Sequence, residues 1–341
     1  MSAYRVRFVS RKINEAIAKH LFREVTIRLG WNRLFVNPPL RELADGTAGQ
    51  VFREHARVLN LDEILLEDPP PFQDDIHRDH DYNRYLPTEV WYHYPEPMTK
   101  DEKIEKYEAL MGEVCQILPA AIASMSKLVE IRYQVDFRSS SQWLGSAVSR
   151  GLSALSNIGT IRIQIQPRAD CSQEDPLENH LQVIGSLKNL HTLEISVLFS
   201  HMPSGLDHLW RDMQATGIQL RSISVDDVSF SLLEYLASFT GLQHLTLSLL
   251  RPHGEKYVDE EEEMAAFLFK TVLARHDRTL SHLAIVGEAN CWSINDYCAT
   301  ALTRCRALVS LTTSLCVLGQ TLAFDIRKSL VRFRSKKVTV H

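Results

Sequence analysis

The sequence predicts an α/β fold, namely a solenoid of alternating strands and helices whose strands form one curved parallel sheet. Three observations predict it: a strand motif repeated seven times, helical periodicity between the copies, and polar residues on one side of every strand. The chain has 341 residues, of which 45% are hydrophobic and 23% charged, as is typical of an ordered globular protein. An elongated repeat array accommodates this length because each unit contacts only its neighbours.

The repeated motif has leucine or isoleucine at its first and fourth positions and an apolar residue, threonine or tyrosine at its sixth. The copies occupy residues 128–133, 158–163, 190–195, 220–225, 242–247, 280–285 and 308–313. They begin 22 to 38 residues apart, with a mean of 30, which is enough for one strand, one helix and two turns. Because side chains alternate along a strand, each copy directs its apolar set to one face of the predicted sheet.

Apolar residues at helical spacing separate the strand motifs. The expected helices cover residues 143–155, 177–187, 206–213, 232–239, 264–273, 292–302 and 322–333. The acidic run 259–263 directly precedes one of them, and negative side chains favour the positive end of a helix dipole. We interpret this run as a solvated helix start rather than as an acidic docking patch.

A doubly wound α/β domain shows a similar alternation and is the competing fold. Its strands are covered by helices on both faces and are therefore apolar on both. The outward positions of the present motifs are instead polar: Glu130, Arg132, Thr160, Arg162, Thr192, Glu194, Ser222, Ser224, His244, Thr246, His282 and Thr312. The sequence also contains neither of the glycine-rich phosphate-binding motifs, so we expect a sheet with one exposed face.

The repeats over residues 120–341 resemble the longer, helix-bearing form of the leucine-rich repeat family. The asparagine or cysteine that usually follows the strand in that family is not consistent here, where Val197, Asp227, Leu249 and Gly287 stand near that place. The resemblance implies that the strands line a concave face that binds a protein substrate. The residues that we expect to contact it are Arg132, Arg162, Glu194, His244 and His282.

The amino-terminal segment 3–29 predicts a helix followed by a strand over 22–27. Segments 8–12 and 21–27, with Ala16 and Ala18, resemble the last helix of a fungal F-box and the strand after it. Segment 51–61 resembles the next helix-to-strand passage, with Val58, Leu59 and Leu61 in the strand. This resemblance implies substrate recognition for a cullin ubiquitin ligase.

The opening Leu-Pro-x-Glu helix and the second helix of the F-box have no counterpart before Ala3. A Skp-type adaptor is therefore implied as a partner only if the F-box is completed upstream. The expected organisation is a residual F-box-like helix and first strand over 1–29, a first repeat-like unit over 30–66, a loop over 67–99 and the repeat array over 100–341. The loop is rich in proline, acidic and aromatic residues, and a helix over 100–125 that bends before Pro119 follows it.

One segment within the loop contains potential metal ligands. Residues 75–81 hold two histidines and three aspartates, and they resemble a metallo-hydrolase motif in which Asp75 replaces the first histidine. No apolar strand precedes the segment, so we interpret it as a solvated loop, with a metal-dependent hydrolase using His77, Asp79 and His80 as the least favoured alternative. The sequence also has no G-x-S-x-G elbow, and we predict no enzyme, catalytic residue, metal or cofactor.

The charge and cysteine content narrow the class of partner. A formal net charge of −4 and a pI near 6.4 disfavour nucleic acid. We assign the basic residues between 327 and 337 to a solvated final helix: Arg327, Lys328, Arg332, Arg334, Lys336 and Lys337. The six cysteines form no C-x-x-C pair, which indicates reduced packing residues in an intracellular protein, and no apolar stretch reaches the 18 residues of a membrane span. The expected function is non-catalytic protein binding, with a ubiquitin-independent scaffold as the alternative.

Overall fold

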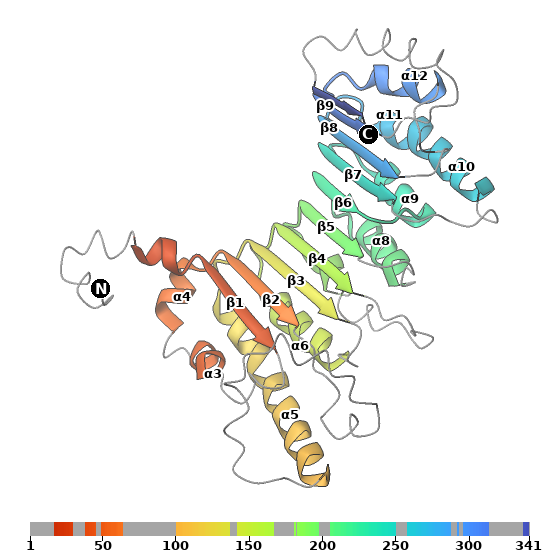
Figure 1. Cartoon of the computed structure of the whole chain (residues 1–341). Helices are drawn as coiled ribbons and strands as arrows, with labels where there is room; N and C mark the ends of the chain where they lie inside the picture. Colours follow the sequence, from red (N-terminus) through yellow and green to blue (C-terminus); the bar gives the residue numbers. More distant parts are fainter. Residues whose placement is uncertain are drawn as a thin grey trace.

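The computed structural model describes residues 17–29, 38–45, 49–63, 100–136, 142–166, 181, 183–197, 205–249, 258–287, 292, 296–313 and 337–340. Within these ranges ten parallel strands form one open sheet in the order of the chain, from β1 at one edge to β10 at the other (Figure 1). The strands are β1 (Glu24–Leu29), β2 (Val58–Glu63), β3 (Glu130–Asp136), β4 (Thr160–Gln166), β5 (Thr192–Val197), β6 (Ser222–Val225), β7 (His244–Leu249), β8 (His282–Gly287), β9 (Ser310–Thr313) and β10 (Lys337–Val340).

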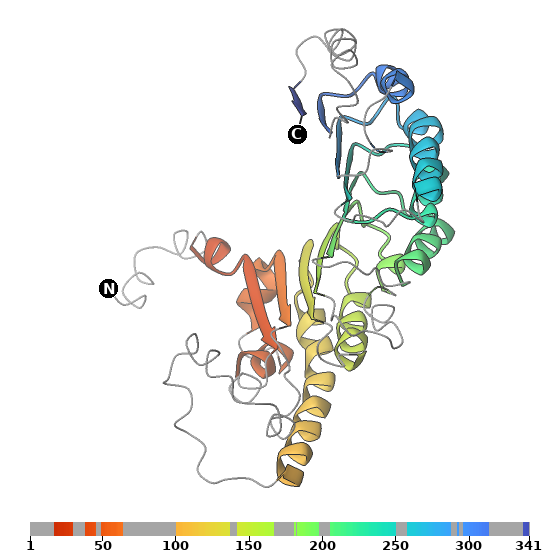
Figure 2. The ribbon, with the colours of Figure 1, turned by 45° about the vertical axis from the view of Figure 1, so that its right-hand side comes forward.

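The helices connect successive strands and cover one face of the sheet (Figure 2). They are α3 (Pro38–Asp45), α4 (Gly49–His55), α5 (Lys100–Ser124), α6 (Gln142–Ser153), the 3-10 helix η5 (Ile184–Ser186), α8 (Gly205–Thr216), α9 (Phe230–Ser238), α10 (Val258–Phe267), the π-helix η7 (Leu268–Val272), α11 (Leu273–Arg275) and α12 (Asp296–Arg304). The sequential strand order and the single helical layer distinguish this α/β fold from the doubly wound alternative.

The strand motifs predicted all seven strands from β3 to β9, but each strand begins two residues later than its motif. The first leucine or isoleucine of the motif lies in the turn before the strand. Leu128, for example, is fully buried, and its N–H donates to the carbonyl of Met125 at 3.0 Å. This position therefore anchors the turn in the core, whereas the ladder of the sheet starts after it.

The same backbone contact recurs at every junction from β1/β2 to β8/β9. The carbonyl of the residue before one strand accepts hydrogen bonds, at 2.7 to 3.0 Å, from the N–H of the residue before the next strand and from the N–H of that strand's first residue. The accepting residues are Arg23, Arg57, Val129, Gly159, His191, Arg221, Gln243 and Ser281. Each unit therefore enters the sheet in the same way as its neighbour, and this defines a repeat-like α/β architecture.

The core lies between the sheet and the helical layer. Inward residues at equal register form continuous rows, such as Ile131, Ile161 and Leu193 on neighbouring strands, each at most 2% exposed. Burying a side chain of this size contributes roughly 1.5–3 kcal/mol. The cysteines Cys298 and Cys305 belong to this core, as predicted for packing residues.

One carboxylate partly replaces the asparagine ladder that leucine-rich repeats usually have after their strands. Asp226 follows β6 and accepts hydrogen bonds from the Ser196 hydroxyl at 2.6 Å and the Val197 N–H at 2.9 Å. Asp226 therefore provides a hydrogen-bond acceptor for the Val197 N–H at the end of β5, although it belongs to the next unit. The expected position for this role was one residue later, at Asp227.

The first repeat-like unit contains the predicted helix-to-strand passage as α4 and β2, with Val58, Leu59 and Leu61 in the strand. The strand expected over 22–27 is β1, which begins at Glu24. Helix α3 was not predicted; it begins with Pro38 and Pro39, which are tolerated in a first turn because those N–H groups have no helical acceptor. An ion pair between Arg41 and Glu113 connects α3 to α5.

Several predicted elements differ from the observed ones. The helix expected over 100–125 is observed as α5, which does not end at Pro119, and the bend expected before Pro119 stays a prediction. The described end of segment 177–187 is the 3-10 turn η5, where Gly185 lowers helix propensity, and segment 264–273 contains the π-helix η7. The assignment of Lys337 to a final helix is wrong, because 337–340 alternates basic or polar residues with valines and pairs with β9 as strand β10.

The acidic run over 259–263 lies in the first part of α10, as predicted, with three of its glutamates exposed and Glu261 only 7% exposed. The loop over 67–99, the helix expected over 322–333 and the other members of the basic cluster lie outside the described residues.

Candidate functional site

The face of the sheet opposite the helices carries all five predicted contact residues. Strand register places Arg132, Arg162 and Glu194 side by side on β3, β4 and β5. His244 and His282 are paired on β7 and β8, in the adjacent row of outward positions. The structure thus divides the predicted set into a charged group and a histidine pair, which β6 separates.

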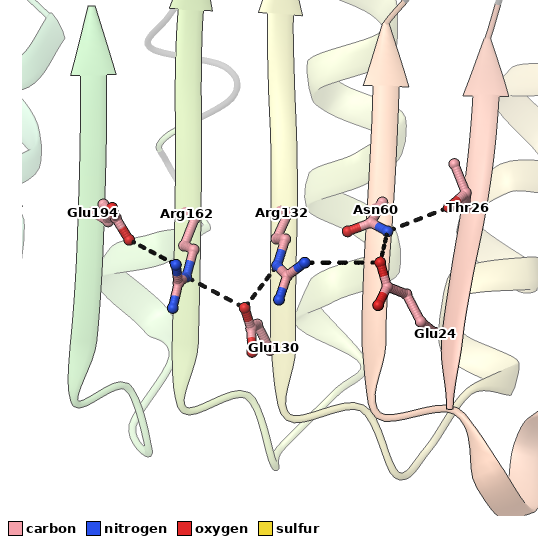
Figure 3. Close-up of polar contacts among 7 residues, drawn as sticks. All are labelled: Glu24, Thr26, Asn60, Glu130, Arg132, Arg162 and Glu194. Carbon is pink, nitrogen blue, oxygen red and sulfur yellow. Dashed lines mark hydrogen bonds and ion pairs between the residues drawn. The ribbon is translucent and has the colours of Figure 1, made fainter. Parts of the chain in front are cut away.

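The charged group belongs to a larger network of polar contacts across five strands, which we call the charge ladder (Figure 3). Its members are Glu24, Thr26, Asn60, Glu130, Arg132, Arg162 and Glu194. At its centre a single oxygen of Glu130 lies 2.8 Å from Nε of Arg132 and 3.3 Å from Nε of Arg162. Nη1 of Arg162 in turn lies 3.2 Å from Glu194.

The other end of the charge ladder reaches the first strand. Nη1 of Arg132 lies 3.7 Å from Oε1 of Glu24. The amide of Asn60 donates to the same oxygen at 2.6 Å and to the Thr26 hydroxyl at 3.2 Å. Acidic and basic side chains therefore alternate from β1 to β5, and each arginine lies between two carboxylates.

The charge ladder is open to solvent. The side chains of Arg132 and Arg162 are 45% and 48% exposed, whereas that of Glu130 is 19% exposed. The hydrogen bond to Glu130 raises the pKa of Arg132, so this guanidinium is charged at any physiological pH. Exposed ion pairs of this kind contribute only about 0–1 kcal/mol each to stability. The ladder therefore orders charged groups on the surface more than it stabilises the fold.

The histidine pair has a different chemistry. The imidazole rings of His244 and His282 stack with centroids 4.4 Å apart and an interplanar angle of 20°. Burial and, next, the neighbouring imidazole of His282 lower the pKa of His244, because both disfavour a second positive charge. Nδ1 of His282 also lies 2.8 Å from the Ser281 hydroxyl. The pair therefore places two imidazole rings in direct contact on the exposed face.

Four members of the charge ladder were not predicted as site residues: Glu24, Thr26, Asn60 and Glu130. The sequence does contain a signal for Glu130, since it lies two residues before Arg132 on the same strand and thus on the same face. Glu24, Thr26 and Asn60 lie on strands β1 and β2, whose register with β3 depends on long connections. Their place beside Arg132 follows only from the folded sheet.

Two further features of the described residues concern metal ligands and membrane-spanning helices. They include no group of three or more histidine, cysteine, aspartate or glutamate residues arranged to hold a metal ion. The proposed hydrolase residues His77, Asp79 and His80 lie outside the described ranges. Among the described helices, none has both the length and the apolar character needed to cross a bilayer.

Comparison with known proteins assigns no family to this chain. No protein-family model matches the sequence, and no curated protein matches it significantly. A solved structure of a protein from Bacteroides fragilis aligns over 71% of this chain and 72% of its own, with 11% identity and a TM-score of 0.33. This similarity is too low to assign a fold or a function to the chain.

Proposed function

We propose that this chain is a non-catalytic protein-binding repeat protein whose exposed sheet face selects a protein substrate. The observation that carries the proposal is the polar face of β1 to β9, which no described helix covers. The charge ladder lies on β1 to β5 of this face and the histidine pair on β7 and β8. A repeat array with helices on one face of its sheet leaves the other face accessible to a partner. No described helix covers that face in either view (Figures 1 and 2).

The proposed shape is a curved solenoid of the leucine-rich-repeat kind. Helices are wider than strands, so stacking strand-and-helix units in one direction favours a bend with the strands on the concave side. A concave surface of this type surrounds a partner over several repeats. The sequential strand order and the recurring backbone contact between units support this proposal.

The charge ladder is the part of the face that we assign to partner selection. Its ion pairs contribute little stability, but they hold Arg132, Arg162 and Glu194 in defined positions. Charges arranged in this way accelerate encounters with a complementary surface and disfavour a partner whose charges are misplaced. His244 and His282 extend the proposed contact surface toward the carboxyl-terminal repeats.

Charge reversal tests this assignment. The double variant R132E/R162E changes the sign of two exposed positions, whereas R211E changes an exposed arginine on helix α8 as a matched control. Cross-linking and mass spectrometry from the source cell should identify partners that the wild type and R211E retain and R132E/R162E loses. The same partners captured by all three proteins would refute the role of the ladder.

We further propose that the bound protein is a substrate of a cullin ubiquitin ligase inside the cell. The support is the F-box-like segment over 3–29, of which residues 17–29 are described as a helical end and strand β1. Two versions should be mixed with a purified Skp-type adaptor: this chain, and the chain extended by the in-frame sequence upstream of Met1. Retention by the extended version supports the ligase role, and failure of both favours the ubiquitin-independent scaffold.

A further inference from the structure

Two imidazole rings lie side by side on the exposed sheet face. His244 and His282 are register partners on adjacent strands, so their backbones fix the two rings next to each other. The rings are nearly parallel, with centroids 4.4 Å apart. Imidazole nitrogens bind zinc, nickel and copper ions when their lone pairs are free and close together.

The Ser281 hydroxyl is a hydrogen-bond partner of His282 and determines which ring nitrogen of His282 has a free lone pair. Its hydroxyl lies within hydrogen-bond distance of the Gln243 carbonyl, at 3.0 Å, and of Nδ1 of His282, at 2.8 Å. When the hydroxyl donates to the carbonyl, its oxygen accepts a hydrogen bond from Nδ1–H of His282, and the free lone pair of His282 is then on Nε2. Metal-binding histidines commonly have such a hydrogen bond on the other ring nitrogen, because it fixes the tautomer and the ring orientation.

The spacing of the rings fits a shared ion after a small adjustment. Two imidazole nitrogens at about 2.0–2.1 Å from a tetrahedral zinc ion lie about 3.3 Å apart. The proposed site requires both rings, whose centroids lie 4.4 Å apart, to turn out of their stacked arrangement toward the shared ion.

We propose that His244 and His282 form a two-histidine site for a late first-row divalent transition metal, with Ser281 as its positioning residue. The described residues provide no third ligand at this place, so the other coordination positions face solvent. In a complex, a side chain of a bound protein can occupy them. That last step rests on the proposed function, but binding of the metal to the isolated chain does not.

Calorimetric titration of the metal-free full chain with Ni²⁺ tests the proposal. The variants are His244→Asn, His282→Asn and the double variant, with His191→Asn as the control, because His191 is exposed at the entry to β5 on the same sheet. Each variant of His244 or His282 should weaken Ni²⁺ binding at the proposed site by at least about tenfold. The control His191→Asn should leave the Ni²⁺ affinity unchanged. Ser281→Ala keeps both imidazoles and should weaken the same site by about tenfold.

Two readouts connect the binding to this pair and do not require a variant to fold. Electron paramagnetic resonance of the wild type with one equivalent of Cu²⁺ should show coupling to two nitrogen nuclei. Zn²⁺ should protect His244 and His282 of the unaltered chain from acylation by diethyl pyrocarbonate, as mapped by mass spectrometry. Equal Ni²⁺ binding by the folded double variant, or full acylation of both histidines in the presence of Zn²⁺, would overturn the proposal, whatever the outcome of the partner experiments.

Discussion

The buried His276 provides the most quantitative test of how neighbouring repeats are held together. It follows α11 with no exposed surface, and it contacts the preceding repeat through both ring nitrogens. Nε2 lies 3.0 Å from the Leu236 carbonyl, and Nδ1 lies 3.3 Å from the Leu242 N–H. Because a carbonyl only accepts and an amide N–H donates, the neutral tautomer with its proton on Nε2 satisfies both contacts.

Replacing His276 with alanine should destabilise the protein by about 3–5 kcal/mol. The substitution removes the ring partner of the Leu242 N–H and the Leu236 carbonyl, and a buried polar group that loses its partner costs about 1–3 kcal/mol. The cavity left by the ring adds to that cost. Urea denaturation at pH 7, followed by far-UV circular dichroism, measures the loss. The control His208→Ala changes an exposed position on α8 and should stay within about 0.5 kcal/mol of wild type.

The same residue should make stability depend on pH. Burial lowers the pKa of His276 and outweighs the hydrogen bond to Leu236, which raises it. Below pH 6.5, the ordinary pKa of histidine, the unfolded chain binds a proton that the folded chain resists. This contribution to stability is therefore complete above pH 6.5 and is lost as the pH falls toward the lowered pKa of the folded state. The slope from one such group is at most about 1.4 kcal/mol per pH unit.

The difference between wild type and variant isolates this contribution from the other histidines. The unfolding free energy of the wild type should fall more steeply between pH 7 and pH 5 than that of His276→Ala, and His208→Ala should follow the wild type. Hydrogen exchange at the Leu242 amide should also become faster in His276→Ala. Parallel pH profiles for wild type and His276→Ala, or a loss below about 1 kcal/mol at pH 7, would refute the assigned hydrogen bonds.

Three further substitutions, and one matched control, test packing and the charge ladder by urea denaturation. Gly151→Ala should lower the unfolding free energy by about 1–3 kcal/mol, because the added Cβ would lie 2.8 Å from Cβ of Ile122. The matched change Gly112→Ala places its Cβ where nothing lies within 4 Å and should stabilise α5 by about 0.5–1 kcal/mol. Equal effects of the two changes would contradict the close contact between the helices. Tyr235→Phe should cost about 0.5–1.5 kcal/mol, since the buried hydroxyl donates to a backbone carbonyl at 3.0 Å, and a neutral result would show that the carbonyl has another partner. Glu130→Gln should cost no more than about 1 kcal/mol, and the difference should shrink in 1 M salt; a larger, salt-independent loss would mean that the ladder supports the fold.

Local sequence was sufficient to predict strands β3 to β9 and their exposed face. Alternation in segments such as 190–195 distinguishes inward Leu193 and Ile195 from outward Glu194, because strand pleating has a period of two. The predicted contact residues therefore lie on the face where they were expected. The motif also contained the reason for the two-residue shift in strand starts, because Leu190 stands three residues before Leu193 and so does not follow the period of two.

Contacts between units were less accessible to sequence analysis. The place of Glu24 beside Arg132 depends on the register of three strands, and no local pattern fixes register across the connection between β2 and β3. His276 stands between two charged residues, Arg275 and Asp277, which is the sequence environment of a surface position. Its full burial arises from packing against the preceding repeat, so only the folded structure identifies it as a structural residue.

The recurring backbone contact explains how units of such different length share one sheet. Successive accepting carbonyls are 22 residues apart from Arg221 to Gln243 but 72 residues apart from Arg57 to Val129. The hydrogen bonds at each entry nevertheless keep the same geometry, because they involve only the turn before the strand. Extra length is therefore accommodated on the strand-to-helix side, where closing a longer loop costs little additional entropy. The strand rows of the sheet therefore keep their spacing while the connections between units vary in length, as the proposed binding face requires.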